Sequence, residues 1–500
     1  MSELQHESLN ATFVGVDKGV CTQYRGIQYG EVAERFADPK ILDNFRGEKV
    51  DCTEWGPRCP QNKYDLGHLI RAPEGDIFED ETEDEFKCLN LDVTVPSKLP
   101  SSGNTKGLPV MVWVHGGSQI VSYGTGSSKI GDPLKLAKDS VELSLPMIIV
   151  SLQYRLNMFH YGDGKATKNL GLKDQQIALK WVQKHIAGFG GDPDDITVIG
   201  ESAGAVFAHA LLVTCPNIRR GILMSGSLYL SPPQPAARGQ AAFVDPMLKK
   251  LQAKGYDSLK DAPVEALLEA QAEVPIPSVF MQEDSDLEGW SQKTGDVEAL
   301  LIGDCEYESI LWRNGVETMT AEQIVECFDK AGASASELKK LYHINPARST
   351  QSKHGVLDFL NDMRFAAPVP LIADLFRKQG KKVYTYLFDQ PNPWQPSSRA
   401  HHAVDLLYLF EGFDISHSKS AAALGQEMRK RFITFITGQA PWSEDKAFAF
   451  GPLGKFGEIS EEEIGDRRRI RQIEALKTLP QTEVNAAFGS LAAGRISLHN

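Results

Sequence analysis

Short apolar runs alternate along the chain with segments whose apolar residues recur at the spacing of an α-helix. The clearest runs lie at residues 108–114, 195–199, 299–303 and 383–388, and glycine, histidine or charged residues flank them. Because strands covered on both faces of a parallel sheet are apolar throughout, the pattern predicts a large, mostly parallel central sheet flanked by helices. Strand-like segments are scattered from residue 11 to about residue 450 without an internal repeat. We therefore expect one α/β domain over residues 1–500.

A sharp turn is predicted at residues 200–204, Gly-Glu-Ser-Ala-Gly. It lies between the predicted strand 195–199 and a helical pattern over residues 203–213. A serine between two glycines at such a strand-to-helix turn projects from the top of a sheet, where its hydroxyl can act as a nucleophile. The five-residue string alone is weak evidence for a nucleophile, because glycine and serine are common. Its structural context makes Ser202 the candidate nucleophile.

A second glycine-containing loop, His-Gly-Gly-Ser at residues 115–118, follows the strand predicted at 108–114. If Ser202 attacks a carbonyl group, backbone N–H groups must bind the negative oxygen that forms. The candidate donors are the N–H groups of Gly116, Gly117, Ser118 and Ala203. A tight turn is the simpler interpretation of His-Gly-Gly in isolation. The position of the loop, after a strand and N-terminal to Ser202, favours an oxyanion loop.

A serine nucleophile also needs a base and an acid that orients the base. The predicted strand 299–303 is followed by three carboxylates, Asp304, Glu306 and Glu308. The residues alone favour none of the three, and a solvated loop is the alternative for all of them. For the base, the chain offers two adjacent histidines at residues 401–402.

Further motifs are spread along the chain in a characteristic order. Residues 169–204 form a dense block that includes Asn-Leu-Gly-Leu-Lys-Asp-Gln and Phe-Gly-Gly-Asp-Pro, and shorter motifs stand at 24–30, 35–36, 59–61, 88–91, 154–156 and 225–226. This series resembles the type-B carboxylesterases, the group that includes the cholinesterases. The resemblance implies an α/β-hydrolase fold with helical cap insertions. It also implies a serine hydrolase that cleaves a small-molecule carboxylic ester through an acyl-enzyme, without a cofactor or a metal, as a monomer or homodimer.

The resemblance separates the competing acids and bases. Family members carry their glutamate five residues after the strand's last glycine and before a small residue, which selects Glu308, with Glu306 as the second choice. Their histidine precedes an acidic residue by three positions and a phenylalanine by eight. His402 fits both offsets, with Asp405 as the acidic residue, whereas His401 fits neither.

Two positions near the predicted site carry further expectations. Glu201, beside the nucleophile, is by resemblance the usual buried acid of the family; ordering water or a cation in the pocket is one role for it, and we favour a structural ion pair with an arginine. Where many members continue the oxyanion loop with glycine and an aromatic residue, this chain has Ser118 and Gln119. We therefore expect a more polar entrance and a less flexible loop. No motif locates the tryptophan of a choline site, so choline esters are not supported.

The strand pattern stops over residues 229–296. A proline-rich stretch at 232–235 and an amphipathic stretch at 262–272 predict helices and loops there. We interpret this insertion as a cap or lid that lies over the nucleophile and shapes the substrate pocket.

Two functions from other classes stay open. The first is a non-catalytic binding protein on the same fold. The presence of Ser202, Glu308 and His402 at motif positions argues against this function. The second is a biosynthetic enzyme that transfers the acyl group to an alcohol or amine, or that forms a lactone or ring. Water and a second acceptor compete for one acyl-enzyme, so the sequence does not separate hydrolysis from transfer.

The charge of the chain restricts its partners. A net charge of −13 argues against nucleic acid and anionic membranes, because both need a basic surface. The acidic run at 79–85 and the arginine-rich run at 467–471 are predicted to be solvated faces, and neither is predicted to bind metal.

The expected location is cytoplasmic, with secretion as the less favoured alternative. The first residues have neither a basic nor an apolar region typical of a signal peptide, and no apolar run is as long as a membrane span. Seven cysteines are few for a secreted scaffold. By resemblance, Cys59 and Cys88 stand where extracellular relatives form a disulfide, and the pair is expected to be able to exist reduced or oxidised.

Overall fold

The computed structural model describes residues 1–73, 77–79, 81–98, 106–164, 167–274 and 279–496. Within this part of the chain, fifteen strands are formed. They are β1 Ser2–His6, β2 Ala11–Asp17, β3 Cys21–Gln28, β4 Gly30–Glu31, β5 Lys40–Ile41, β6 Glu48–Asp51, β7 Asn90–Pro96, β8 Leu108–Val114, β9 Ile148–Leu152, β10 Gly191–Glu201, β11 Arg220–Met224, β12 Ala299–Cys305, β13 Lys382–Phe388, β14 Ala447–Phe450 and β15 Phe456–Ile459.

The described strands make a thirteen-stranded sheet in the order β1-β2-β3-β7-β9-β8-β10-β11-β12-β13-β14-β15, with β6 paired to β2. From β9 to β14 every neighbouring pair is parallel, whereas the pairs from β1 to β9 in this order and the pair β14-β15 are antiparallel. The prediction of a mostly parallel central sheet is confirmed. Because the parallel strands all end at the same edge, the loops after β8, β10 and β12 meet there.

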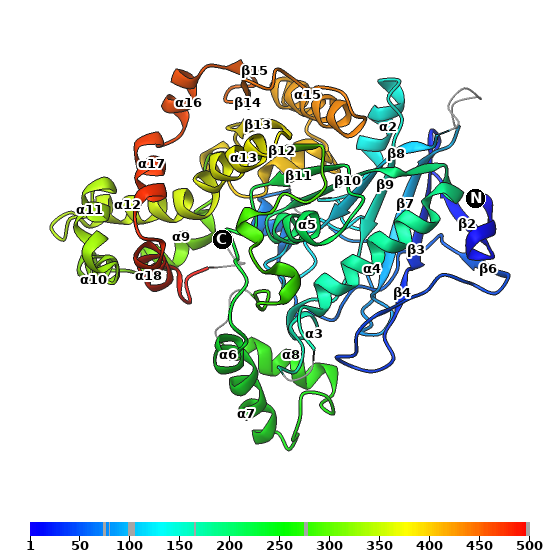
Figure 1. The fold of residues 1–500 in the computed structure, drawn as a ribbon, viewed down its shortest axis with the longest axis horizontal. Coiled ribbons are helices and arrows are strands. Elements are labelled where there is room, and N and C mark those ends of the chain that lie inside the picture. The colour runs from blue at the N-terminus through cyan, green and yellow to red at the C-terminus, as the bar shows by residue number, and fades with distance from the viewer. Residues whose placement is uncertain (74–76, 80, 99–105, 165–166, 275–278, 497–500) are drawn as a thin grey trace.

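Helices cover both faces of the sheet (Figure 1). They are α1 Leu66–Ile70, α2 Leu134–Glu142, α3 Asn157–Tyr161, α4 Leu170–His185, α5 Ala203–Thr214, α6 Ala236–Gly239, α7 Asp245–Ala253, α8 Val264–Ala272, α9 Ile310–Glu317, α10 Ala321–Asp329, α11 Ala335–Leu341, α12 Ser349–Asn361, α13 Pro368–Lys378, α14 Val404–Leu409, α15 Lys419–Ile436, α16 Glu461–Arg467, α17 Ile470–Thr478 and α18 Gln481–Ala492.

Strand β8 shows why the apolar runs are continuous. Val112 and Val114 face a core that contains residues of α4, α5 and α13, while Met111 and Trp113 face a core that contains residues of α2, α14 and α15. Successive side chains of a strand point to opposite faces, so a strand covered on both sides needs apolar residues at every position. A third core joins α9 through α12 with α18, at one end of the molecule (Figure 1).

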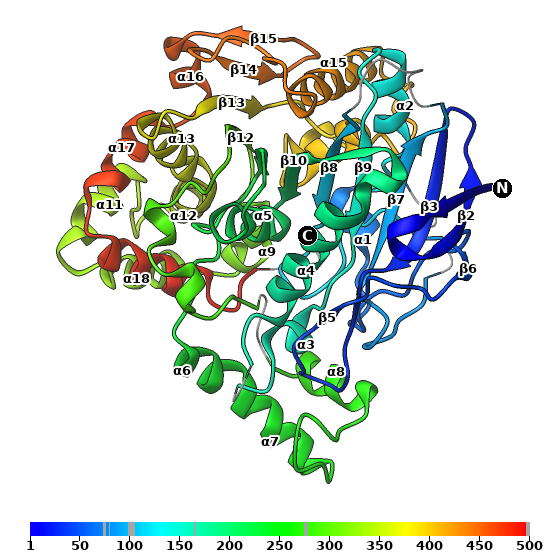
Figure 2. The same ribbon diagram turned by 45° about the vertical axis from the view of Figure 1, so that its right-hand side comes forward.

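The insertion at 229–296 is helical in its described part, as predicted, and contains α6, α7 and α8. Residues 275–278 lie outside the described residues. These helices form a lobe below the body of the molecule in Figures 1 and 2. The lobe packs on Tyr161, at the end of α3, through Phe243 and Phe280. Its role as a cap stays a prediction.

Two smaller findings bear on the predicted environment of the protein. No described helix is both long enough and apolar enough to span a membrane. Cys59 and Cys88 are buried free thiols. Their hydrogen bond, together with burial, raises the pKa of Cys88 well above its usual value.

Candidate active site

Ser202 lies at a strained turn between β10 and α5. Its backbone has φ 55° and ψ −124°, an unusual conformation for a residue with a side chain. The flanking glycines are required by close backbone contacts: a Cβ on Gly200 would lie 2.2 Å from the carbonyl oxygen of Gly204, and a Cβ on Gly204 would lie 2.1 Å from that of Val114. The sequence therefore places the Ser202 hydroxyl at the end of the sheet, as the turn motif predicts.

Ser202, His402 and Glu308 form a continuous chain of contacts. His402 Nε2 is 2.8 Å from Ser202 Oγ, and His402 Nδ1 is 2.5 Å from Glu308 Oε2. The three residues follow different strands, since Ser202 comes after β10, Glu308 after β12 and His402 in the loop between β13 and α14. This arrangement can take a proton from the serine hydroxyl and stabilise the imidazolium that results.

Hydrogen bonds fix both the side chain and the backbone of Glu308. The N–H of Cys305 donates to Glu308 Oε1 at 2.7 Å, and Asn361 Oδ1 accepts from the Glu308 N–H at 2.8 Å. The Glu308 side chain is fully buried. The carboxylate is thus held with one oxygen on the backbone and the other on His402.

Glu306 and His401, the sequence alternatives to Glu308 and His402, contact other residues. Glu306 pairs with Arg399 at 2.6 Å on the partly exposed outside of the loop. His401 is buried against Asn392, whose side-chain nitrogen lies 3.0 Å from His401 Nε2, and burial lowers the pKa of His401 to about 4. Neither residue reaches Ser202.

The loop after β8 carries the predicted oxyanion donors, with one exception. The N–H of Gly116 donates to the carbonyl oxygen of Tyr123 at 3.0 Å, so this donor is already used and the prediction for Gly116 is not supported. Gly117 has φ 111°, and a Cβ there would lie 2.0 Å from the Val121 carbonyl oxygen. Ser118 continues the turn with φ 56°. Ala203 is the first residue of α5, where an N–H has no acceptor within the helix.

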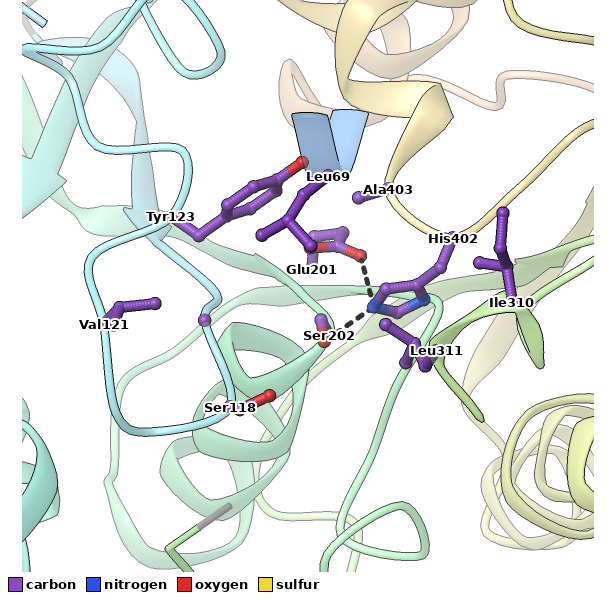
Figure 3. A pocket seen from close by; sticks show the side chains of 11 residues that line it. Leu69, Ser118, Val121, Tyr123, Glu201, Ser202, Ile310, Leu311, His402 and Ala403 are labelled. Atoms are coloured by element: carbon purple, nitrogen blue, oxygen red, sulfur yellow. Dashed lines mark hydrogen bonds and ion pairs between the residues drawn. The ribbon is translucent and has the colours of Figure 1, made fainter. Parts of the chain in front are cut away.

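A small cavity of about 40 Å³ opens beside the Ser202 hydroxyl. Figure 3 shows Ser118, Val121 and Tyr123 on one side of it and Leu311 beside His402 on the other. The full lining is Leu69, Gly117, Ser118, Val121, Tyr123, Glu201, Ser202, Ile310, Leu311, His402 and Ala403. The lining side chains are mainly apolar, and none comes from the described part of the insertion at 229–296. The structure thus brings the predicted nucleophile, base and oxyanion loop to one cavity.

Glu201 lies in this cavity wall, but not in the contact predicted for it. Its ion-pair partner among the described residues is His402, with Glu201 Oε1 3.3 Å from His402 Nε2 (Figure 3), and no arginine pairs with it there. The predicted arginine pair is therefore wrong. The pKa of Glu201 is raised well above its usual value, mainly by burial and to a smaller extent by repulsion from Asp405 and Glu308.

Asp405 is a third buried carboxylate in the same region, and the sequence singles it out only by its offset from His402. Burial and repulsion from Glu308 raise the pKa of Asp405 to about 7. Three buried acids therefore surround one histidine. In the described residues, they do not form a cluster of side chains suited to a metal ion.

Comparisons with known proteins extend this description. Residues 11–458 match the model of the carboxylesterase family. The chain is 30% identical to Lipase 3 of Yarrowia lipolytica over 98% of its own length and 99% of the relative. It is 28% identical to the para-nitrobenzyl esterase of Bacillus subtilis, with 82% and 83% of the two chains covered. A solved PNB esterase structure superposes with a TM-score of 0.74 and 25% identity, covering 93% of this chain and 99% of that one.

Proposed function

The chain belongs to the carboxylesterase family and is a carboxylic ester hydrolase, and on this premise we propose that it works through an acyl-enzyme on Ser202, with His402 as base and Glu308 as orienting acid. The observation that carries the proposal is the chain of contacts from Ser202 Oγ to His402 Nε2 at 2.8 Å and from His402 Nδ1 to Glu308 at 2.5 Å. The fold alone would not carry it, because one fold supports many functions.

The reaction follows from these positions. His402 Nε2 accepts the Ser202 proton as Oγ attacks the ester carbonyl carbon, and the imidazolium is stabilised by the Glu308 carboxylate at Nδ1. The tetrahedral intermediate collapses, the C–O bond to the alcohol breaks, and His402 returns the proton to the leaving oxygen. Water then repeats the sequence on the acyl-enzyme and releases the acid.

The negative oxygen of the intermediate is assigned to the N–H groups of Gly117, Ser118 and Ala203. Gly117 and Ser118 line the cavity beside Ser202, and Ala203 begins α5, whose N-terminal end favours negative charge. Gly116 is left out, because its N–H donates to Tyr123. Its amide fixes the shape of the loop instead.

A series of p-nitrophenyl esters, from acetyl to long acyl chains, tests the function. The cavity of about 40 Å³ at Ser202 has room for only a few water molecules, since one water needs about 10–15 Å³ of such space. We therefore expect kcat/KM to be highest for the shortest acyl groups and to fall as the chain grows. Equal or rising kcat/KM for long chains would contradict the use of this cavity for the acyl group.

The same assay distinguishes hydrolysis from acyl transfer. The products are analysed with and without an added alcohol, and hydrolysis predicts that free acid dominates in both samples. Transfer of most acyl groups to the alcohol at a concentration far below that of water would instead indicate a biosynthetic transferase. No turnover of any simple ester would contradict the proposal in its general form.

The two glutamates after β12 provide a matched pair of variants. Glu308→Gln is expected to lower kcat by about ten-thousandfold, because the amide cannot hold the histidine tautomer or offset its charge. Glu306→Gln loses only a surface pair with Arg399, and kcat should change by about twofold or less. Steady-state kinetics of both variants, with thermal unfolding as a check on folding, decides the assignment. Comparable losses in the two variants would show that Glu308 has no special role.

A further inference from the structure

The arginine-rich run at 467–471 is not a solvated face. Arg468 is only 7% exposed and lies between α16 and α17, which run along the outside of α13 (Figure 1). Arg467 and Arg469 also form ion pairs with buried carboxylates, those of Asp389 and Asp362. The prediction of solvation is therefore wrong for these three arginines, whose partners come from distant parts of the chain.

Arg468 binds Asp304, near the end of β12, with two of its nitrogen atoms, and Asp389, just after β13, with the third. Its Nε lies 3.1 Å from Asp304 Oδ2, its Nη2 donates to the backbone carbonyl oxygen of Asp304 at 3.1 Å, and its Nη1 lies 2.8 Å from Asp389 Oδ1. Asp304 and Arg468 are 164 residues apart in sequence. A guanidinium can make these contacts together because its donors have a fixed planar arrangement.

The carbonyl that Arg468 binds belongs to the peptide group that holds Glu308. The Asp304 C=O and the Cys305 N–H are the two polar ends of one peptide unit, and the Cys305 N–H donates to Glu308 Oε1 at 2.7 Å. We propose that Arg468 is a positioning residue for the reaction, which orients and polarises the peptide unit between Asp304 and Cys305 and so fixes the carboxylate of Glu308 against His402.

Two physical effects support this role. A cation at the carbonyl oxygen draws electrons toward that end of the peptide, which makes the N–H at the other end a stronger donor to the carboxylate. The same contact fixes the plane of the peptide, and with it the direction in which the N–H points. Glu308 Oε2 must remain 2.5 Å from His402 Nδ1, so a small rotation of this plane would be transmitted to the base.

Arg467 provides a matched control next in sequence. It pairs with the same Asp389, at 2.7 Å, and donates to the carbonyl oxygen of Gly451 at 2.9 Å, but none of its contacts is to Asp304. It therefore shares the ion-pair network of Arg468 and not the contact with the peptide. Loss of the ion-pair network should affect folding when either arginine is replaced. Misplacement of Glu308 should occur only when Arg468 is replaced.

The inference rests on the proposed function, and Arg468→Lys tests it against Arg467→Lys. Lysine keeps the charge but cannot donate to the carbonyl and both carboxylates in this geometry. Arg468→Lys is expected to lower kcat for a short p-nitrophenyl ester by about tenfold to a hundredfold with little change in KM, because a misplaced group costs rate more than binding. In Arg467→Lys, kcat should change by about twofold or less.

A double variant separates catalysis from stability. Arg468→Met with Asp304→Asn removes a buried cation and a buried anion together, a change that is often neutral or stabilising for folding. We expect it to unfold at a temperature close to that of the wild type and yet to show the loss of kcat seen in Arg468→Lys. A double variant with wild-type kcat would overturn the proposal, as would equal losses of kcat in Arg468→Lys and Arg467→Lys.

The rate of labelling by a fluorophosphonate distinguishes failure of this proposal from failure of the function. Wild-type protein that is labelled at Ser202, together with an unimpaired Arg468→Lys variant, would overturn only the role of Arg468. Wild-type protein that is not labelled at Ser202 would overturn the function on which that role depends.

Discussion

Ser202→Ala is expected to lower kcat for ester hydrolysis by about a millionfold, the scale seen when a serine nucleophile is removed. Alanine cannot form the acyl-enzyme, and any residual rate would come from binding and from the N–H groups at the oxyanion position. The substitution removes one oxygen atom, whose hydrogen bond is the one to His402. The unfolding temperature should therefore stay close to that of the wild type, and steady-state kinetics at high enzyme concentration measures the remaining rate.

An inactive but unfolded variant would not count as support, so the comparison requires matched unfolding curves. A folded Ser202→Ala variant with a kcat within about tenfold of the wild type would show that another group attacks the ester, since a true nucleophile contributes far more.

His402→Ala is expected to cause a loss of kcat of similar size, about a millionfold, because serine and base act as one unit. Without the imidazole, the Ser202 hydroxyl has no partner at 2.8 Å to accept its proton. His401→Ala is the matched control, because His401 is adjacent in sequence and contacts Asn392 instead of the serine. This second variant should lose stability through a buried cavity but retain most of its kcat per folded molecule.

The two histidine variants also test the sequence offset that selected His402. Kinetics should be normalised to folded protein, because His401→Ala removes a fully buried side chain. A folded, active His402→Ala variant beside a folded, inactive His401→Ala variant would move the base by one residue.

The nucleophile region could be predicted well because its signals are local. Strand β8 has the predicted bounds, and the turn at Ser202 follows from two glycines whose neighbours leave no room for a Cβ. The three carboxylates after β12 could not be separated by local pattern. The structure separates them by distant partners: Arg468 for Asp304, Arg399 for Glu306 and His402 for Glu308.

The errors share one physical cause, which is that charge runs do not reveal their partners. In the acidic run, Glu85 pairs with Arg35 at 2.6 Å, and Glu81 and Glu83 both pair with Arg58, so this run is not simply solvated either. Asp80 of this run lies outside the described residues. The wrong arginine pair of Glu201 has the same origin, because the sequence does not show that its charged neighbours are the base His402 and two other acids, Asp405 and Glu308.

The Gly116 N–H is not free to bind an oxyanion, because it makes a hydrogen bond inside its own loop. The hydrogen bond from Gly116 to Tyr123 bridges seven residues and needs the left-handed backbone at Ser118 and Gln119. Most residues with a side chain avoid this conformation, so a loop with Ser-Gln at these positions does not reveal it in sequence. The glycines alone therefore identified the loop but not which amides are free to bind an oxyanion.

The most direct test of the account is to map the residue that a fluorophosphonate probe modifies. Intact-mass measurement should show one added probe per wild-type chain, and peptide sequencing by mass spectrometry should place it on Ser202. The Ser202→Ala variant should gain no probe under the same conditions. Stoichiometric labelling of the folded Ser202→Ala variant, or a modified peptide that does not contain Ser202 in the wild type, would contradict the proposal that Ser202 forms the acyl-enzyme.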